Sequence, residues 1–124
     1  MEKKKIYIID DSENFKENLR EILKENYELL GDTNDGLVGF DFICKNKVDL
    51  VIADIVLQNI DGFEFLEKLQ EVDGLTKPKV LIVSSLKGED FAEKAISLGA
   101  NYYLIKRICS SSAMFFSICS SLTE

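Results

Sequence analysis

The sequence predicts an α/β fold in which five strands form one parallel sheet with helices on both faces. Short apolar runs rich in Ile, Val and Tyr alternate with longer stretches in which apolar residues recur every three or four positions, the pattern of repeated strand–helix units. Three of the runs lack polar alternation, as expected of strands that are covered on both faces. A chain of 124 residues can bury one core, so we expect a single domain over residues 1–124.

The apolar runs place the strands at about 5–9, 28–32, 49–53, 79–84 and 101–105. The first helix should begin at 12–14, with Ser12 or Asn14 as its N-terminal cap, and end near 26. Its apolar residues recur at spacings of three and four and form one inward face: Phe15, Leu19, Ile22 and Leu23.

The second and third helices fill the gaps on either side of the third strand. The second is expected at about 36–46, and its inward residues should be Leu37, Phe40 and Ile43. The third follows the turn Asp61-Gly62 and runs to about 72, with an inward face of Phe63, Leu66 and Leu69.

The fourth helix follows 88–90 and ends at Gly99, because glycine accepts the left-handed conformation of a helix C-terminus. Its inward residues should be Phe91, Ala95, Ile96 and Leu98. A fifth helix is expected at about 110–122, with an apolar face of Met114, Phe115, Ile118, Cys119 and Leu122. Its polar face is nearly all serine, which distinguishes it from the other four.

Composition excludes several classes of function. Fifteen basic and 22 acidic residues give a net charge of −7, which argues against direct binding of nucleic acid or of an anionic membrane. The apolar runs are far shorter than a membrane span, and Met1 leads into a charged stretch rather than a signal peptide, so we expect a cytoplasmic protein. The chain has no histidine, which excludes Ser/His/Asp and Cys/His catalysis and histidine-ligated metals. Its cysteines, Cys44, Cys109 and Cys119, form no CxxC pair and should be reduced.

Polar residues follow four of the predicted strands where each strand ends. Asp10 and Asp11 end the first, Asp54 the third, Ser84 the fourth and Lys106 the fifth. Because ligands of such folds bind outside the carboxyl ends of the strands, we expect these side chains to meet. Three carboxylates could bind Mg²⁺, one could act as a nucleophile toward a phosphoryl group, and the hydroxyl and the ammonium could stabilise its charge. Taken singly, each has an ordinary structural role as a cap, a core hydroxyl or a solvated lysine.

Together these motifs resemble the response-regulator receiver domain. The likeness rests on Asp10-Asp11, on the stretch from Asp54 to Gly62, on Ser84 after Val80-Leu81-Ile82-Val83, and on the segment from Leu98 to Lys106. It implies a doubly wound, flavodoxin-like (βα)5 fold with strand order 2-1-3-4-5. Within the family, the segments around Ser84 and Leu98 are most similar to receivers of sporulation-type phosphorelay regulators.

The resemblance also implies a role for each residue. Asp54 would accept a phosphoryl group from a histidine kinase or a histidine phosphotransfer protein. Asp11 would bind Mg²⁺ directly, Asp10 largely through water, and Val56 through its backbone carbonyl. Ser84 and Lys106 would contact the phosphoryl oxygens, and Ser84 and Tyr103 would form the switch. The chain would not be an enzyme beyond assisting its own phosphorylation and slow dephosphorylation. Phosphorylation would alter the face made by the fourth helix, the fifth strand and the fifth helix, on which a homodimer could form.

The chain departs from the family pattern at several positions. Position 58 is Gln in place of the common proline, and Ser84 replaces the commoner threonine. Arg107 replaces a proline that usually follows the lysine in a cis bond; since a cis bond before another residue costs about 2.5 to 4 kcal/mol, we predict a trans Lys106–Arg107 bond and a shifted loop. Val56 and Leu86 flank the expected path of attacking water and cannot orient it, which predicts slow loss of the phosphoryl group.

Three other functions fit parts of the sequence. A degenerate receiver could act as an interaction module that does not depend on phosphorylation, with Arg107 and the serine-rich last helix as its signs. A dehalogenase-like phosphatase would need a second acid two residues after its nucleophile, where this chain has Val56. A flavin carrier would need a hydroxyl-rich phosphate loop after the first strand, where the acids would repel a phosphate.

Overall fold

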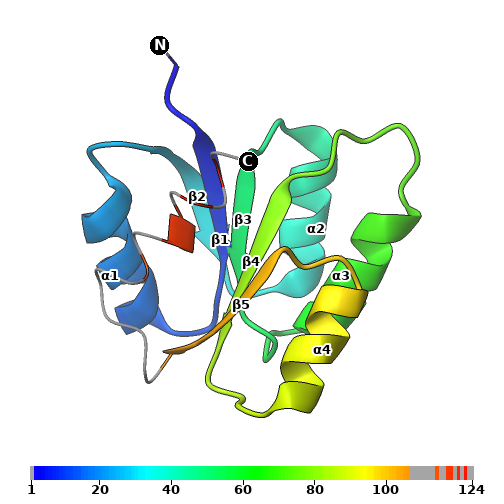
Figure 1. Ribbon diagram of the computed structural model, residues 1–124. Coiled ribbons are helices and arrows are strands. Elements are labelled where there is room, and N and C mark those ends of the chain that lie inside the picture. The colour runs from blue at the N-terminus through cyan, green and yellow to red at the C-terminus, as the bar shows by residue number, and fades with distance from the viewer. Residues whose placement is uncertain (1, 107–113, 115–116, 119, 121, 123–124) are drawn as a thin grey trace.

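In the computed structural model, which describes residues 2–106, 114, 117–118, 120 and 122, five parallel strands form one sheet in the order β2-β1-β3-β4-β5 (Figure 1). The strands are β1 (Lys5–Ile9), β2 (Glu28–Thr33), β3 (Leu50–Ala53), β4 (Lys79–Ser84) and β5 (Tyr102–Ile105). The predicted number and order of strands are confirmed, and each strand end lies within one residue of its predicted place. The central strands β1, β3 and β4 are almost wholly buried, whereas the edge strands β2 and β5 are partly exposed.

Helices cover both faces of this sheet. They are α1 (Glu13–Leu23), α2 (Gly36–Lys45), α3 (Gly62–Glu71) and α4 (Glu89–Ser97). One buried cluster joins the sheet to residues of α2, α3 and α4, and a second joins the other face to α1 and to Met114 and Ile118 (Figure 1). Successive strand residues alternate between the clusters: Ile6, Ile8 and Ile52 belong to the second, and Tyr7, Ile9 and Val51 to the first.

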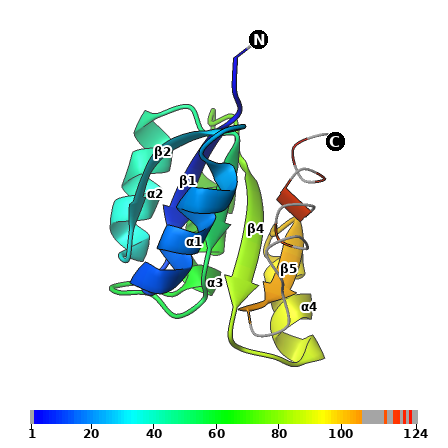
Figure 2. The same cartoon turned by 90° about the vertical axis from the view of Figure 1, so that its left-hand side faces the viewer.

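The predicted fifth helix is described at five positions only. Met114, Ser117, Ile118, Ser120 and Leu122 are helical, and Met114 and Ile118 are buried against the α1 face of the sheet. The other residues of 110–122, and the Lys106–Arg107 bond, lie outside the described residues. Figure 2 shows the fifth strand beside β4, with α4 next to it at the edge of the sheet.

The helix starts follow the expected capping chemistry. Ser12 accepts a hydrogen bond from Phe15 N at the start of α1, and Asp61 forms a capping box with Glu64 at the start of α3. Gly99 has a φ of 109° after α4, as predicted for the residue that ends this helix. The first helix ends at Leu23 rather than near 26, because the chain must turn to place Glu28 N 2.9 Å from Lys4 O.

Two predicted inward faces were wrong in part. Leu37 is 42% exposed on α2, because the glycines of this helix, rather than its leucine, face the interior of the protein. A Cβ atom at Gly36 would lie 2.6 Å from Ile60, and one at Gly39 would overlap the Ile9 side chain. Glycine has no apolar side chain, so a search for apolar spacing misses such a stripe.

The fourth helix contacts the sheet through a small residue. Ala95 is fully buried, whereas Phe91 is 36% exposed and Ile96 is 48% exposed, which corrects the predicted burial of both. Ile96 follows Ala95 directly and so points about 100° away from it around the helix. Two apolar side chains, Phe91 and Ile96, therefore remain exposed among the polar residues of α4.

Two further observations concern the predicted setting of the chain. None of the described helices is long and apolar enough to cross a membrane. Cys44 is a free, exposed thiol, and Cys109 and Cys119 lie outside the described residues.

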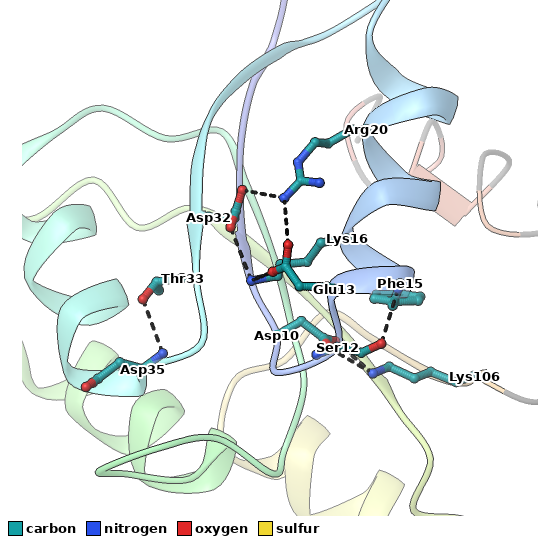
Figure 3. Close-up of polar contacts among 10 residues, drawn as sticks. All are labelled: Asp10, Ser12, Glu13, Phe15, Lys16, Arg20, Asp32, Thr33, Asp35 and Lys106. Carbon is teal, nitrogen blue, oxygen red and sulfur yellow. Dashed lines mark hydrogen bonds and ion pairs between the residues drawn. The ribbon is translucent and has the colours of Figure 1, made fainter.

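An ion-pair network around a buried lysine fastens α1 to the edge strand β2 (Figure 3). Lys16 is 5% exposed, and its Nζ lies 2.7 Å from Glu13 Oε2 and 3.2 Å from Asp32 Oδ1. Arg20 Nη2 lies 3.0 Å from Asp32 Oδ2. Burial alone would raise the pKa of Asp32, but hydrogen bonds from Arg20 and Lys16, with their charges, lower it below its ordinary value. Asp32 therefore stabilises the fold as an ionised group.

Replacing Asp32 by asparagine should lower the free energy of unfolding by about 1 to 2 kcal/mol at pH 7, because the buried ammonium of Lys16 loses a charged partner. Urea unfolding measures this loss. Since the pKa of Asp32 is lowered on folding, the wild-type advantage should be complete above the unfolded carboxyl pKa of about 3.9 and disappear as the pH falls below it. The control is Glu13→Gln, which removes an exposed partner and should cost less than about 1 kcal/mol. Equal losses from the two variants would contradict this role of Asp32.

Candidate functional site

The carboxyl ends of β1, β3, β4 and β5 lie at the edge of the sheet opposite the N-terminus, which is the lower edge in Figure 1. Asp10 directly follows β1, Asp54 follows β3, Ser84 is the last residue of β4, and Lys106 follows β5. The parallel register pairs Ala53 with both Ile9 and Ile82, and β4 continues for two more residues to Ser84, which pairs with Ile105. The four predicted side chains therefore share one edge.

A single ammonium group joins the two buried acids. Lys106 Nζ lies 3.0 Å from Asp10 Oδ1, 2.9 Å from Asp10 Oδ2 and 3.1 Å from Asp54 Oδ2. Asp10 is 1% exposed and Asp54 is 5% exposed. Because an unpaired carboxylate is costly to bury, the lysine supplies the opposite charge that offsets the burial of both acids. We call this arrangement the Asp10–Lys106–Asp54 triad.

Backbone groups orient both carboxylates. Ser12 N donates to Asp10 Oδ1 at 2.8 Å, and Ile55 N donates to Asp54 Oδ1 at 2.6 Å. Behind Asp54, Gly62 N donates to Ile55 O at 2.7 Å, and a Cβ atom at Gly62 would lie 2.5 Å from Asp54 O. Sequence reasoning identified Gly62 only as part of a turn, but its lack of a side chain lets α3 begin directly behind Asp54.

The carboxylate of Asp10 has one oxygen with spare capacity. Burial raises the pKa of Asp10, more than the hydrogen bonds from Lys106 and Ser12 and the charge of Lys106 lower it, and the nearby charge of Asp54 raises it further. Its Oδ2 atom is buried and has no hydrogen-bond partner, although the Lys106 ammonium lies near it. A divalent cation that took the place of the ammonium would find an acceptor in this oxygen.

The predicted metal ligands are not all brought together. Asp11 is exposed, and no three acidic or cysteine side chains in the described ranges form a cluster of the kind that holds a metal ion. Val56, whose carbonyl is a predicted ligand, lies in the loop after Asp54 and is 57% exposed. The oxygen donors nevertheless fit a hard divalent cation, because the two buried carboxylates face the same space and the Asp10 Oδ2 atom, which pairs with the Lys106 ammonium, accepts no hydrogen bond. In this structure the ammonium of Lys106 lies between the carboxylates of Asp10 and Asp54.

The predicted switch residues converge on one backbone position. Ser84 is fully buried, and its Oγ accepts a hydrogen bond from Leu86 N at 3.1 Å. The Tyr103 hydroxyl donates to Leu86 O at 2.6 Å. Burial raises the pKa of Tyr103, a hydrogen bond with Ser84 lowers it in part, and the charge of Asp54 raises it. Both hydroxyls therefore hold the loop after β4 at Leu86.

An aromatic ring completes the surroundings of Lys106. The ammonium lies 4.5 Å from the centre of the Phe15 ring, within the range of a cation–π interaction. Sequence reasoning assigned Phe15 to the core-facing side of the first helix and missed this contact. The sequence signal for this contact was the position of Phe15 in the first turn of the helix that follows Asp10.

Residues 6–114 match the family described as the response regulator receiver domain. Chemotaxis protein CheY from Halobacterium salinarum is 31% identical over 103 residues, covering 83% of this chain and 84% of that protein. A protein-glutamate methylesterase/protein-glutamine glutaminase 1 from Methanospirillum hungatei JF-1 is 33% identical over 106 residues, covering 82% of this chain. The chain spans 30% of the length of that methylesterase.

Among solved structures, a two-component response regulator of the LuxR family from Aurantimonas sp. SI85-9A1 aligns with a TM-score of 0.87 at 23% identity. The alignment covers 98% of this chain and 86% of that chain. At this identity the likeness concerns the fold alone. The narrower similarity to sporulation-type receivers stays a prediction.

Replacing Asp10 by asparagine should raise the free energy of unfolding at pH 7 in EDTA, because the change removes a buried charge while Lys106 keeps Asp54 as a partner. Urea unfolding at several pH values tests this. The pKa of Asp10 is raised on folding, so its contribution to stability is present at acid pH and is lost as the pH rises through the folded pKa. The advantage of the variant should therefore grow from about pH 4 to pH 7. A variant less stable than the wild type at pH 7 would contradict this account.

Proposed function

This chain belongs to the response regulator receiver family, and from that premise we propose that it is a phosphorylation-dependent switch of a two-component system or phosphorelay, with residues 1–124 as one receiver domain. Receiver domains are signalling domains rather than enzymes in general. The observation that carries the proposal is the Asp10–Lys106–Asp54 triad, in which a buried carboxylate at a strand end lies 3.1 Å from an ammonium group. A buried carboxylate is available as a nucleophile only where a neighbouring positive charge offsets its own charge.

In the proposed reaction, Asp54 attacks the phosphorus of a phosphohistidine carried by a histidine kinase or a histidine phosphotransfer protein. A bond forms between a carboxylate oxygen and phosphorus, the phosphorus–nitrogen bond breaks, and its electron pair returns to the imidazole ring. Lys106 stabilises charge on the phosphoryl oxygens, and the hydroxyl of Ser84 donates a hydrogen bond to one of them. This chain has no histidine, so the donor is another protein.

Mg²⁺ is the proposed cofactor, held by Asp10, Asp11, Asp54 and the carbonyl of Val56. The Asp10 Oδ2 atom, which is buried, pairs with the Lys106 ammonium and accepts no hydrogen bond, supports this assignment. When bound, the ion neutralises negative charge between the carboxylates and the phosphoryl group. Asp11 is exposed, so its side chain can turn toward the site without leaving a buried environment.

The proposed signal passes through Leu86. A phosphoryl group on Asp54 draws the Ser84 hydroxyl, which otherwise accepts from Leu86 N. The Tyr103 hydroxyl donates a hydrogen bond to Leu86 O, so a movement of the loop at Leu86 would also move Tyr103 on β5 and the start of α4. The face formed by α4, β5 and the predicted fifth helix would then change its affinity for a partner or for a second copy of this chain.

The proposed partners are proteins. A net charge of −7 disfavours direct binding of nucleic acid by this chain. The cytoplasm is the proposed compartment, where an exposed thiol such as Cys44 stays reduced.

Beryllofluoride mimics a phosphoryl group on a carboxylate. With Mg²⁺, it should shift the amide NMR signals of Leu86 and Tyr103 in the wild type, because both residues are bonded in the path from Ser84. Asp54→Asn should abolish the shifts, and Asp73→Asn, at an exposed acid between α3 and β4, is the matched control that should leave them intact. Absence of any Asp54-dependent shift would favour an interaction module that works without phosphorylation.

The phosphoryl group should be lost slowly, over minutes or longer, because neither Val56 nor Leu86 can orient an attacking water. Radiolabel decay in Mg²⁺ gives the half-life. Val56 is 57% exposed, so Val56→Asn places an amide near the site without cutting into the core and should shorten the half-life. A wild-type half-life of seconds would refute this expectation.

A further inference from the structure

The Lys106 ammonium is enclosed on two sides by acids and on a third by an aromatic face. Asp10 and Asp54 contact Nζ at 2.9 to 3.1 Å, and the centre of the Phe15 ring lies 4.5 Å away. The lysine side chain is only 18% exposed, so little water competes with the ring. A cation–π contact is strengthened by such desolvation.

The ring is held in place from two directions. Phe15 N donates to Ser12 Oγ at 3.2 Å, and Ser12 N donates to Asp10 Oδ1 at 2.8 Å (Figure 3). The Phe15 side chain also packs against the buried cluster on the α1 face of the sheet. The same carboxylate that binds Lys106 therefore fixes the turn that places the ring over it.

A divalent cation would compete with this ammonium. Both need oxygens of Asp10 and Asp54, and two cations cannot occupy the space between these carboxylates without repulsion. Any contact that stabilises the ammonium between the acids must weaken cation binding, by at most the same factor, because the two equilibria are linked.

We propose that Phe15 is a positioning residue that holds the Lys106 ammonium between Asp10 and Asp54 and thereby lowers the affinity of the phosphoacceptor site for divalent cations. The inference rests on the proposed function in that it takes this acidic pair as the cation site. Phe15 was not among the predicted site residues. Phe15 makes the resting triad favourable in the absence of the metal and leaves the site to be loaded only at sufficient cation concentration.

Titration with Mg²⁺ alone, followed by amide NMR, tests the proposal. Phe15→Leu keeps an apolar side chain but removes the ring, and it should lower the Mg²⁺ dissociation constant roughly two- to five-fold. Phe15→Trp restores a stronger π face and should bring the constant back to the wild-type value or above it. Phe42→Leu is the matched control, because it removes a ring that stacks on Tyr7 in the other buried cluster, and it should leave Mg²⁺ affinity unchanged.

A double-mutant cycle separates positioning from general packing. In a Lys106→Ala background no ammonium remains to be held, so adding Phe15→Leu should have no further effect on Mg²⁺ binding. A spectroscopic signal gives a second readout. The ε-methylene protons of Lys106 should show a ring-current shift that disappears in Phe15→Leu and as Mg²⁺ is added.

Unchanged or weaker Mg²⁺ binding in Phe15→Leu would overturn the proposal, as would an equal effect of that change with and without Lys106. Absence of saturable Mg²⁺ binding in every variant would overturn both this inference and the proposed cofactor. Mg²⁺ binding that responds to Phe15 in a protein that no phosphoryl donor modifies at Asp54 would contradict the proposed function and leave the inference standing.

Discussion

The constraint on which the site depends is that two buried carboxylates share one ammonium group. Asp10 and Asp54 end neighbouring parallel strands and have almost no contact with solvent, yet Lys106 lies within about 3 Å of both. Leaving one such charge unpaired would cost several kcal/mol. The two acids therefore need a positive charge between them, which Lys106 supplies here and for which a metal ion would compete.

The fold supplies this geometry through backbone contacts rather than through large side chains. The parallel pairing brings the strand ends to one edge, Ser12 and Ile55 donate to the carboxylates, and Gly62 lets a helix begin against the backbone of Asp54. The acids are fixed by these backbone contacts, whereas Lys106 contributes only the end of a long side chain that is 18% exposed. A cation carried in this way can be exchanged without rebuilding the core.

The apolar runs were sufficient for the strands, and the strand-end acids for the edge at which the polar residues gather, whereas the strand order followed from the resemblance to receiver domains. The sequence was insufficient where contact depends on the absence of a side chain. Gly36 and Gly39 displace Leu37 from the inward face of α2, and Ala95 does the same for Ile96 on α4. The contact between Phe15 and Lys106 was not predicted. An aromatic residue at the spacing of core residues gives the same sequence pattern whether its ring covers an aliphatic group or an ammonium. Asp11 stands beside Asp10 in the chain but points to solvent, since adjacent residues at a strand end face in different directions.

The measurement that tests the central claim most directly is the site of phosphoryl attachment. The protein is treated with acetyl phosphate and Mg²⁺, its intact mass is recorded, and the acyl phosphate is reduced with borohydride so that peptide mapping reveals the modified position. The account predicts the addition of one phosphoryl group, located at Asp54. No addition under these conditions, or attachment at any other residue, would contradict it.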